Sequence, residues 1–187
     1  ESDYQYQIDN YTKCLKIDSD YTSAYNNRGV AYKALGEYKD AIVDFTIAIR
    51  IEPDYIEAYG NRGNAYYDLG NYEDAIADFT KAIRINTATA LTHYNRGNVY
   101  YKIGSYNEAI ADYSRAIRID PTVASVYYNR GITYDNLKNY KDAIVDYTMA
   151  IRINPDYASA YKNRGITKQD AGLSYCIDYK RACDLGK

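Results

Sequence analysis

The triplet Asn-Arg-Gly recurs through the chain at one constant interval, and this interval restricts the fold more than any other feature. The triplets begin at Asn27, Asn61, Asn95, Asn129 and Asn163, so each step is 34 residues. A second set keeps the same step, namely Ala41, Ala75, Ala109 and Ala143. A fixed period of this length indicates stacked structural repeats and not a single globular core.

The repetition divides the chain into four full copies and two partial ones. The full copies span residues 22–55, 56–89, 90–123 and 124–157. Residues 1–21 match the second half of a copy, and residues 158–187 match a copy that has lost two residues near Gly172. Because each copy in such a stack contacts only its neighbours, we predict one solenoid domain over residues 1–187.

Each copy has the pattern of two helices joined by a short turn. In the first copy, Tyr25, Gly29 and Tyr32 share one stripe of helical period. Gly36 suits the left-handed turn that ends a helix, and a second helix is expected from about Lys39 to Ile51. A small residue on the stripe lets two helix backbones approach closely. The fold class is therefore all-α, built from antiparallel helix pairs.

The pattern within a copy resembles the tetratricopeptide repeat. In the first copy it consists of Tyr25, Gly29, Tyr32, Ala41, Phe45, Ala48 and Pro53. It departs locally: Thr87 replaces the proline of the second copy, His93 the first tyrosine of the third and Lys168 the second tyrosine of the last. The resemblance implies a right-handed α–α superhelix whose first helices line a concave groove. Members of this family usually bind peptides or protein segments there and are rarely enzymes.

The first helix of each copy carries one asparagine on the side opposite its core stripe. A carboxamide both donates and accepts hydrogen bonds, so it can pair with the backbone of an extended peptide whatever the peptide sequence. Neighbouring tyrosines would add stacking surface. The predicted peptide-binding residues are Asn27, Asn61, Asn64, Tyr67, Asn95, Asn98, Tyr101, Asn129 and Asn163. The row is similar to the asparagine ladder of O-linked N-acetylglucosamine transferases, whose groove holds extended polypeptide. The alternative is that these asparagines hydrogen-bond to neighbouring helices or to water.

A row of arginines precedes the glycines, and a row of aspartates recurs in the second helices, for example Arg28 and Asp44. We expect them to form ion pairs between helices, which fix the packing angle more than they stabilise, since exposed pairs contribute ~0–1 kcal/mol. The carboxylate clamp of co-chaperone family members is not expected. Asn26 and Leu91 stand where those members carry lysines, and carboxylate capture without cations is weak.

Other chemistries have little support in the sequence. His93 is the only histidine, so neither a zinc site nor a Ser/His/Asp triad can be assembled, and we expect no metal, no cofactor and no enzymatic activity. Cys14, Cys176 and Cys183 are expected to be half-buried apolar residues. Cys176 and Cys183 would lie about 10 Å apart along one helix, too far for a disulfide.

Charge and hydropathy exclude two further classes of partner. The net charge of −2 argues against nucleic-acid binding, and no apolar run is long enough to insert into a membrane. We therefore predict a scaffold or adaptor that binds a protein or peptide in a concave groove. Two alternatives remain open: a structural scaffold that self-associates end to end into a homo-oligomer, and a regulatory arm of a larger protein. A cytoplasmic location is favoured, but Glu1 falls inside a copy, so an upstream targeting segment can be missing.

Overall fold

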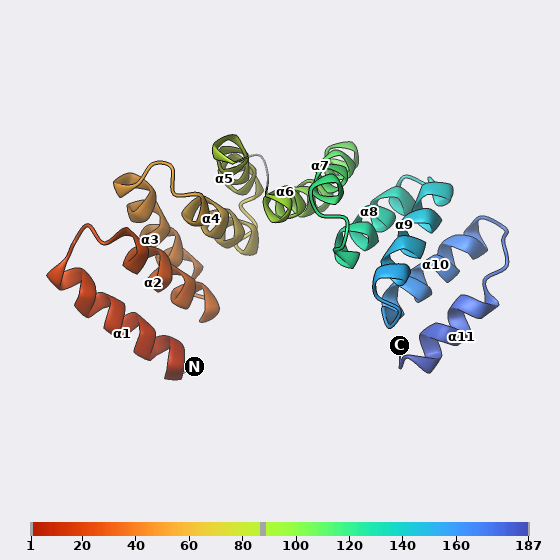
Figure 1. The fold of residues 1–187 in the computed structure, drawn as a ribbon, viewed down its shortest axis with the longest axis horizontal. Coiled ribbons are helices and arrows are strands. Elements are labelled where there is room, and N and C mark those ends of the chain that lie inside the picture. The colour runs from red at the N-terminus through yellow and green to blue at the C-terminus, as the bar shows by residue number, and fades with distance from the viewer. Residues whose placement is uncertain (1, 87–88, 187) are drawn as a thin grey trace. The chain divides into compact units, whose positions relative to one another are not determined.

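A computed structural model describes residues 2–86 and 89–186 of the chain, with side chains from residue 3 onward. Glu1 and Thr87, whose departure from the repeat pattern was noted above, lie outside these ranges. Within them, all regular elements are α-helices, which confirms the all-α class (Figure 1). The chain divides into two compact units, Glu1–Ala88 and Thr89–Lys187. The prediction of one continuous solenoid domain stays a prediction.

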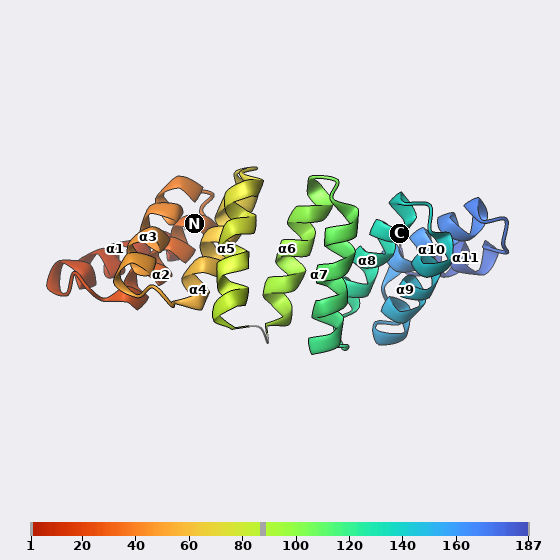
Figure 2. The same ribbon diagram turned by 90° about the horizontal axis from the view of Figure 1, so that it is seen from above.

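The first unit stacks two helix pairs behind a single helix. Its helices are α1 (Ser2–Ile17), α2 (Thr22–Ala34), α3 (Tyr38–Ile51), α4 (Ile56–Asp68) and α5 (Tyr72–Ile85). The pairs α2–α3 and α4–α5 each pack antiparallel, and α3 packs on α4 to join them (Figure 2). The first helices of the two pairs, α2 and α4, also touch directly. Helix α1 packs on α2, as expected of the second half of a copy.

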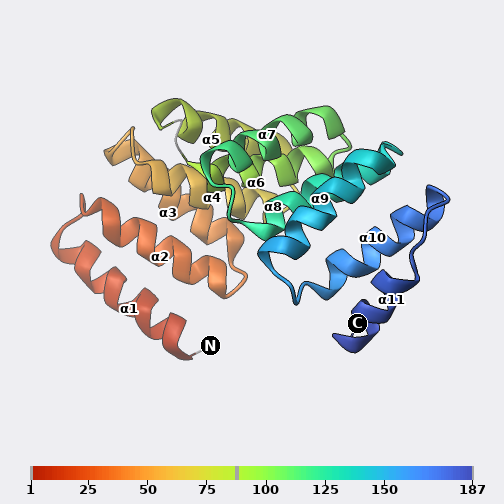
Figure 3. The same cartoon turned by 45° about the vertical axis from the view of Figure 1, so that its right-hand side comes forward.

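The second unit repeats this arrangement with three pairs. Its helices are α6 (Ala90–Lys102), α7 (Tyr106–Ile119), α8 (Ala124–Asn136), α9 (Tyr140–Ile153), α10 (Ala158–Asp170) and α11 (Cys176–Asp184). The first helices α6, α8 and α10 contact one another in order. Helix α11 lies along α10 at the end of the unit (Figure 3).

Each pair is locked by an aromatic ring that fills the space above a glycine. A Cβ atom placed on Gly29 of α2 would lie 2.7 Å from Cε1 of Phe45 in α3, which is closer than atoms can approach. Phe45 is fully buried, with Ala41 and Ala48 on the same face of α3. In the third copy the ring is Tyr113, and the corresponding distance from Gly97 is 2.8 Å. The small residue of the repeat is therefore required for contact between the helices.

The turn between paired helices needs a left-handed residue. Gly36 has φ of +81° in the first copy, where glycine bears no steric penalty. Lys138 takes the same position in the fourth copy with φ of +58°. A lysine there has a Cβ that disfavours this conformation, so the fourth turn is locally strained.

The expected ion pairs between helices form in every pair. They are Arg28–Asp44, Arg62–Asp78, Arg96–Asp112, Arg130–Asp146 and Arg164–Asp178. In the fourth copy, Nε and Nη2 of Arg130 donate to the two oxygens of Asp146 at 2.7 and 2.8 Å. Its Nη1 donates to the Ser114 hydroxyl on α7 at 2.8 Å, so one guanidinium joins three helices.

The carboxylates of these pairs are buried, whereas the sequence predicted exposed ion pairs. The Asp146 side chain is only 3% exposed, whereas that of Arg130 is 18% exposed. Burial raises the pKa of Asp146, although the bonds from Arg130 oppose the shift. Removal of one partner from such a buried pair therefore costs more than the ~0–1 kcal/mol contributed by an exposed pair.

The last helix pair is shorter than the others. Asp178 pairs with Arg164 from 14 residues away, where other copies use 16, and α11 has 9 residues against 14 in α9. Lys168, which replaces a tyrosine, brings its Nζ to 2.8 Å from the same carboxylate. Burial favours a higher pKa for Asp178, but the bonds from Arg164 and Lys168 outweigh it and lower the pKa.

The prediction of half-buried cysteines is wrong. Cys14, Cys176 and Cys183 are all exposed. Cys14 is in register with the buried Ala48 of α3, but α3 packs on helices at both sides, whereas among the described residues α1 packs on α2 alone. Within the described part of the chain, helix α11 likewise packs only on α10, and its cysteines face solvent.

Candidate functional site

In the first unit, the predicted asparagines form a hydrogen-bonded chain across the two first helices. Asn61 of α4 donates through Nδ2 to Oδ1 of Asn26 on α2 at 3.0 Å. Asn26, which is buried, in turn donates to Oδ1 of Asn27 at 3.4 Å. Asn27 is exposed, and Asn61 is half-buried. The structure therefore brings Asn27 and Asn61 together on one face of this unit.

The second unit shows the same lateral bonding with tyrosine as the partner. Asn129 of α8 donates to the Tyr94 hydroxyl and to Oδ1 of Asn98, both on α6, at 3.0 Å. Asn163 of α10 donates to the Tyr128 hydroxyl on α8, also at 3.0 Å. Each partner belongs to the preceding copy, so every such bond links two stacked pairs.

A helical wheel of one first helix does not reveal these hydrogen-bond partners. Asn26, Tyr94 and Tyr128 each stand directly before an asparagine of the predicted row, 35 residues from the one that they bind. That position changes from copy to copy while the asparagine row does not, and this contrast is the signal that could have found them. Its residues are Asn26, Gly60, Tyr94, Tyr128 and Lys162. Their hydrogen bonds hold the asparagine side chains in one orientation.

The other predicted residues lie on the first helices α4 and α6. Tyr67 pairs with Tyr72 at the end of α4, with ring centroids 5.8 Å apart. Tyr101 pairs with Tyr106 at 5.7 Å, and its hydroxyl accepts a bond from Asn136 of α8 at 3.2 Å. The remaining two predicted residues, Asn64 and Asn95, are half-buried on α4 and α6.

Charges on the first helices are largely compensated by their neighbours. Lys33 and Asp68 form an ion pair at 3.0 Å between α2 and α4. In the second unit, the Thr167 hydroxyl donates to Asp135 at 3.1 Å, and burial raises the pKa of this carboxyl. These faces therefore offer carboxamides, phenols and paired charges instead of a cationic surface.

His93 replaces a tyrosine inside the third pair. It is 6% exposed, and its Nδ1 lies 3.0 Å from Oδ1 of Asp112, the carboxylate that Arg96 also binds. The imidazole is thus part of the packing between α6 and α7. Across the described ranges 2–86 and 89–186, no cluster of three histidine, cysteine or acidic side chains could hold a metal ion.

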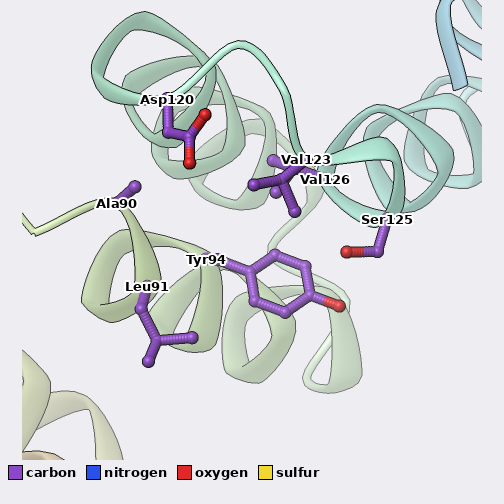
Figure 4. A pocket seen from close by; sticks show the side chains of 7 residues that line it. All are labelled: Ala90, Leu91, Tyr94, Asp120, Val123, Ser125 and Val126. Atoms are coloured by element: carbon purple, nitrogen blue, oxygen red, sulfur yellow. The ribbon is translucent and has the colours of Figure 1, made fainter. Parts of the chain in front are cut away.

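A pocket of about 210 Å³ opens beside the asparagine row of the second unit (Figure 4). It lies between the start of α6, the loop that follows α7 and the start of α8. The Tyr94 ring forms one side, and the Asp120 carboxylate lies across from it (Figure 4). The lining residues are Ala90, Leu91, Tyr94, Asp120, Val123, Ser125 and Val126.

Family models match most of the repeats directly. Models described as "TPR repeat" match residues 63–104 and 97–138, and models described as "Tetratricopeptide repeat" match 22–55, 124–157 and 45–77. Together these matches run from residue 22 to residue 157. The chain belongs to the tetratricopeptide repeat family. As a member of it, the chain is a protein-interaction scaffold.

Solved structures share the fold of this tetratricopeptide repeat protein. A crystal structure of MamA is 27% identical with a TM-score of 0.80, covering 84% of this chain and 93% of that one. MamA of Desulfovibrio magneticus RS-1 is 20% identical with a TM-score of 0.79, covering 88% and 92%. YrrB, described as a TPR protein with an unusual peptide-binding site, is 20% identical with a TM-score of 0.78, covering 94% and 92%. No curated protein matches the sequence at a significant level. In the described part of the chain, no helix is long and apolar enough to cross a membrane.

Proposed function

We propose that this scaffold binds an extended polypeptide segment along the asparagine-bearing faces of its first helices. The observation that carries the proposal is the fixed orientation of the asparagine side chains. Asn61 and Asn129 each use Nδ2 to bind the preceding first helix. Among hydrogen bonds between described residues, their Oδ1 atoms accept none, so each presents an acceptor to a peptide N–H. Side chains held in place before binding lose less entropy on binding.

The spacing of the helices suits an extended chain. Packed helices lie about 8–10 Å apart, and an extended peptide advances about 3.3 Å per residue. One carboxamide would therefore meet about every third peptide residue. Contacts of this kind involve the peptide backbone and therefore give little specificity for the peptide sequence. The similarity in fold to YrrB, whose description includes a peptide-binding site, also supports the proposal.

The test is a binding survey with a panel of arrayed 12-residue peptides of unrelated sequence. Fluorescence anisotropy would measure binding to the wild-type chain and to the triple variant Asn61→Ala, Asn95→Ala, Asn129→Ala. We expect several unrelated peptides to bind the wild type and at least tenfold weaker binding to the triple variant.

The matched control is Asn107→Ala, because Asn107 is exposed on the second helix α7, away from the asparagine row. This variant should bind like the wild type. Circular dichroism would establish that all the variants keep their helix content. A folded triple variant that binds every peptide as tightly as the wild type would refute the proposed surface.

A further inference from the structure

The pocket beside Tyr94 occupies a space that the next junction between copies fills with a ring of the chain itself. There, Tyr157 lies against Tyr128 with ring centroids 4.8 Å apart and an interplanar angle of 37°. The residues 34 positions earlier are Val123 and Tyr94. Tyr94 thus keeps the ring that corresponds to Tyr128, whereas Val123 replaces the tyrosine that would stack on it. The pocket exists because that second ring is absent.

The backbone at this position suits a tyrosine. Val123 has φ of −92° and ψ of 100°, close to the −73° and 91° of Tyr55 in the first copy. Tyr21, Tyr55 and Tyr157 all stand at this place in their copies. The difference between the junctions therefore lies in the side chain and not in the path of the chain.

The pocket is large enough and apolar enough to hold an aromatic ring. A cavity of roughly 150 Å³ lined by aliphatic and aromatic side chains binds benzene, and this pocket measures about 210 Å³. Leu91, at its edge, is 64% exposed, and the same position in the next copy is Ser125. An exposed leucine and a missing ring at one place leave an apolar surface that a partner can cover.

Two polar features at the pocket favour a phenol. The Tyr94 ring is held by the bond from Asn129 to its hydroxyl, so its face is fixed for tilted stacking. The Asp120 carboxylate is bound by the hydroxyl and N–H of Thr122 at 2.6 and 2.9 Å. The bond from the Thr122 hydroxyl, and to a smaller extent the bond from its N–H, lower the pKa of Asp120, so this carboxyl is ionised at neutral pH. Both bonds end on Oδ1, which leaves Oδ2 to accept from a phenol O–H.

We propose that this pocket binds a tyrosine side chain of the polypeptide partner, stacked on Tyr94 with its hydroxyl toward Asp120. The partner would place its ring where the next junction places Tyr157. This assignment rests on the proposed function for the rest of the polypeptide, whereas the ring site itself can be tested alone. It gives the scaffold a preference for sequence that the carboxamides do not supply.

The first experiment uses 4-methylphenol, the side chain of tyrosine, as the probe on the full chain. Methyl NMR would follow Leu91, Val123 and Val126 during titration, with 3-methyl-1-butanol as an aliphatic comparator. We expect saturable shifts at these methyl groups with 4-methylphenol, and binding at least tenfold weaker for the aliphatic alcohol. Equal binding of the two probes, or no shifts at these methyl groups, would overturn the proposal.

Two reciprocal variants provide the control. Val123→Tyr should fill the pocket with a ring of the chain, abolish binding of 4-methylphenol and leave the melting temperature unchanged or higher. Tyr157→Val should create a second pocket over Tyr128 that binds the same probe. Undiminished binding by a folded Val123→Tyr variant would place the probe elsewhere and exclude this site.

The peptide panel separates this inference from the proposed function. Val123→Tyr should remove the preference for peptides that contain tyrosine and keep the weaker binding of the others. If the triple asparagine variant binds peptides normally while 4-methylphenol still requires Val123, the carboxamide surface fails and the ring site stands. If the triple variant loses binding but no tyrosine preference exists, the ring site fails alone.

Discussion

Replacement of Arg130 by methionine should destabilise the chain far more than loss of an exposed charge. Methionine keeps an apolar stem against Tyr127 and Tyr134, over which the guanidinium now lies at 5.9 Å. What is lost is the partner of Asp146, a carboxylate whose side chain is 3% exposed and which accepts two bonds from Arg130. Removal of one partner from a buried pair typically costs about 3–5 kcal/mol, because a buried charge is left unpaired.

The penalty should depend on pH in a defined direction. Burial already raises the pKa of Asp146 while Arg130 is present. Without the cation, the folded-state pKa rises further above the unfolded value of about 3.9, so the folded state favours the neutral acid. The penalty is therefore largest near neutral pH and shrinks as the pH falls toward the unfolded pKa. At pH 5 it should be clearly smaller than at pH 7.

Urea unfolding followed by circular dichroism measures both effects. With an m-value of about 2 kcal/mol/M, the Arg130→Met variant should lose roughly 1.5–2.5 M from its midpoint at pH 7. Arg152→Met is the control, because Arg152 is an exposed arginine on α9 that forms no ion pair with the described residues. A loss below about 1 kcal/mol at pH 7, or an equal loss in the control, would show that the buried carboxylate does not depend on its arginine.

Three further predictions concern backbone and ring positions. Gly29→Ala should lower the free energy of unfolding by about 1–3 kcal/mol through overpacking. Gly60→Ala should raise it by about 0.5–1 kcal/mol, because a methyl group at Gly60 in α4 would meet no other atom. Denaturant titrations measure both changes. Lys138→Gly should relieve the left-handed turn and raise stability by about 0.5–1 kcal/mol, while Lys141→Gly inside α9 should lower it; equal effects in calorimetry would contradict the argument. Burial raises the pKa of Tyr157 to about 12, so its contribution is complete below the unfolded value near 10 and is lost as the pH rises toward 12. The Tyr157→Phe variant should therefore lose less stability than the wild type between about pH 9 and pH 11, as measured by urea midpoints.

Most of the fold follows from the sequence because the repeat period determines it. The step of 34 residues set the copy boundaries, and the pairing of Gly29 with a ring on the next helix followed from the need for close approach. The pairing of Arg164 with Asp178 across a shortened turn was also predictable, since the two rows could be aligned by register. These features depend on spacing along the chain, which the sequence contains completely.

The candidate site was less predictable, because it depends on contacts between copies. A helical wheel places Asn129 on the right face but cannot show that Tyr94 of the preceding copy binds it. The valine at position 123 is visible in the sequence, yet the resulting pocket becomes apparent only beside the ring contact of Tyr157 in the next junction. The exposure of Cys14 likewise depends on a neighbouring helix and not on register.

The bond from each arginine to the preceding copy has a consequence for how such a chain can change in length. Arg28, Arg62, Arg130 and Arg164 each donate through Nη1 to a hydroxyl located 16 residues earlier, on the second helix of the preceding copy. After duplication or deletion of a whole 34-residue segment, each arginine would still meet an equivalent hydroxyl, so no new kind of contact is needed. A change of any other length has to be absorbed in a turn, as in the shortened last copy, where Arg164 still reaches both Thr148 and Asp178. Related chains are thus expected to differ in length mostly by whole 34-residue copies.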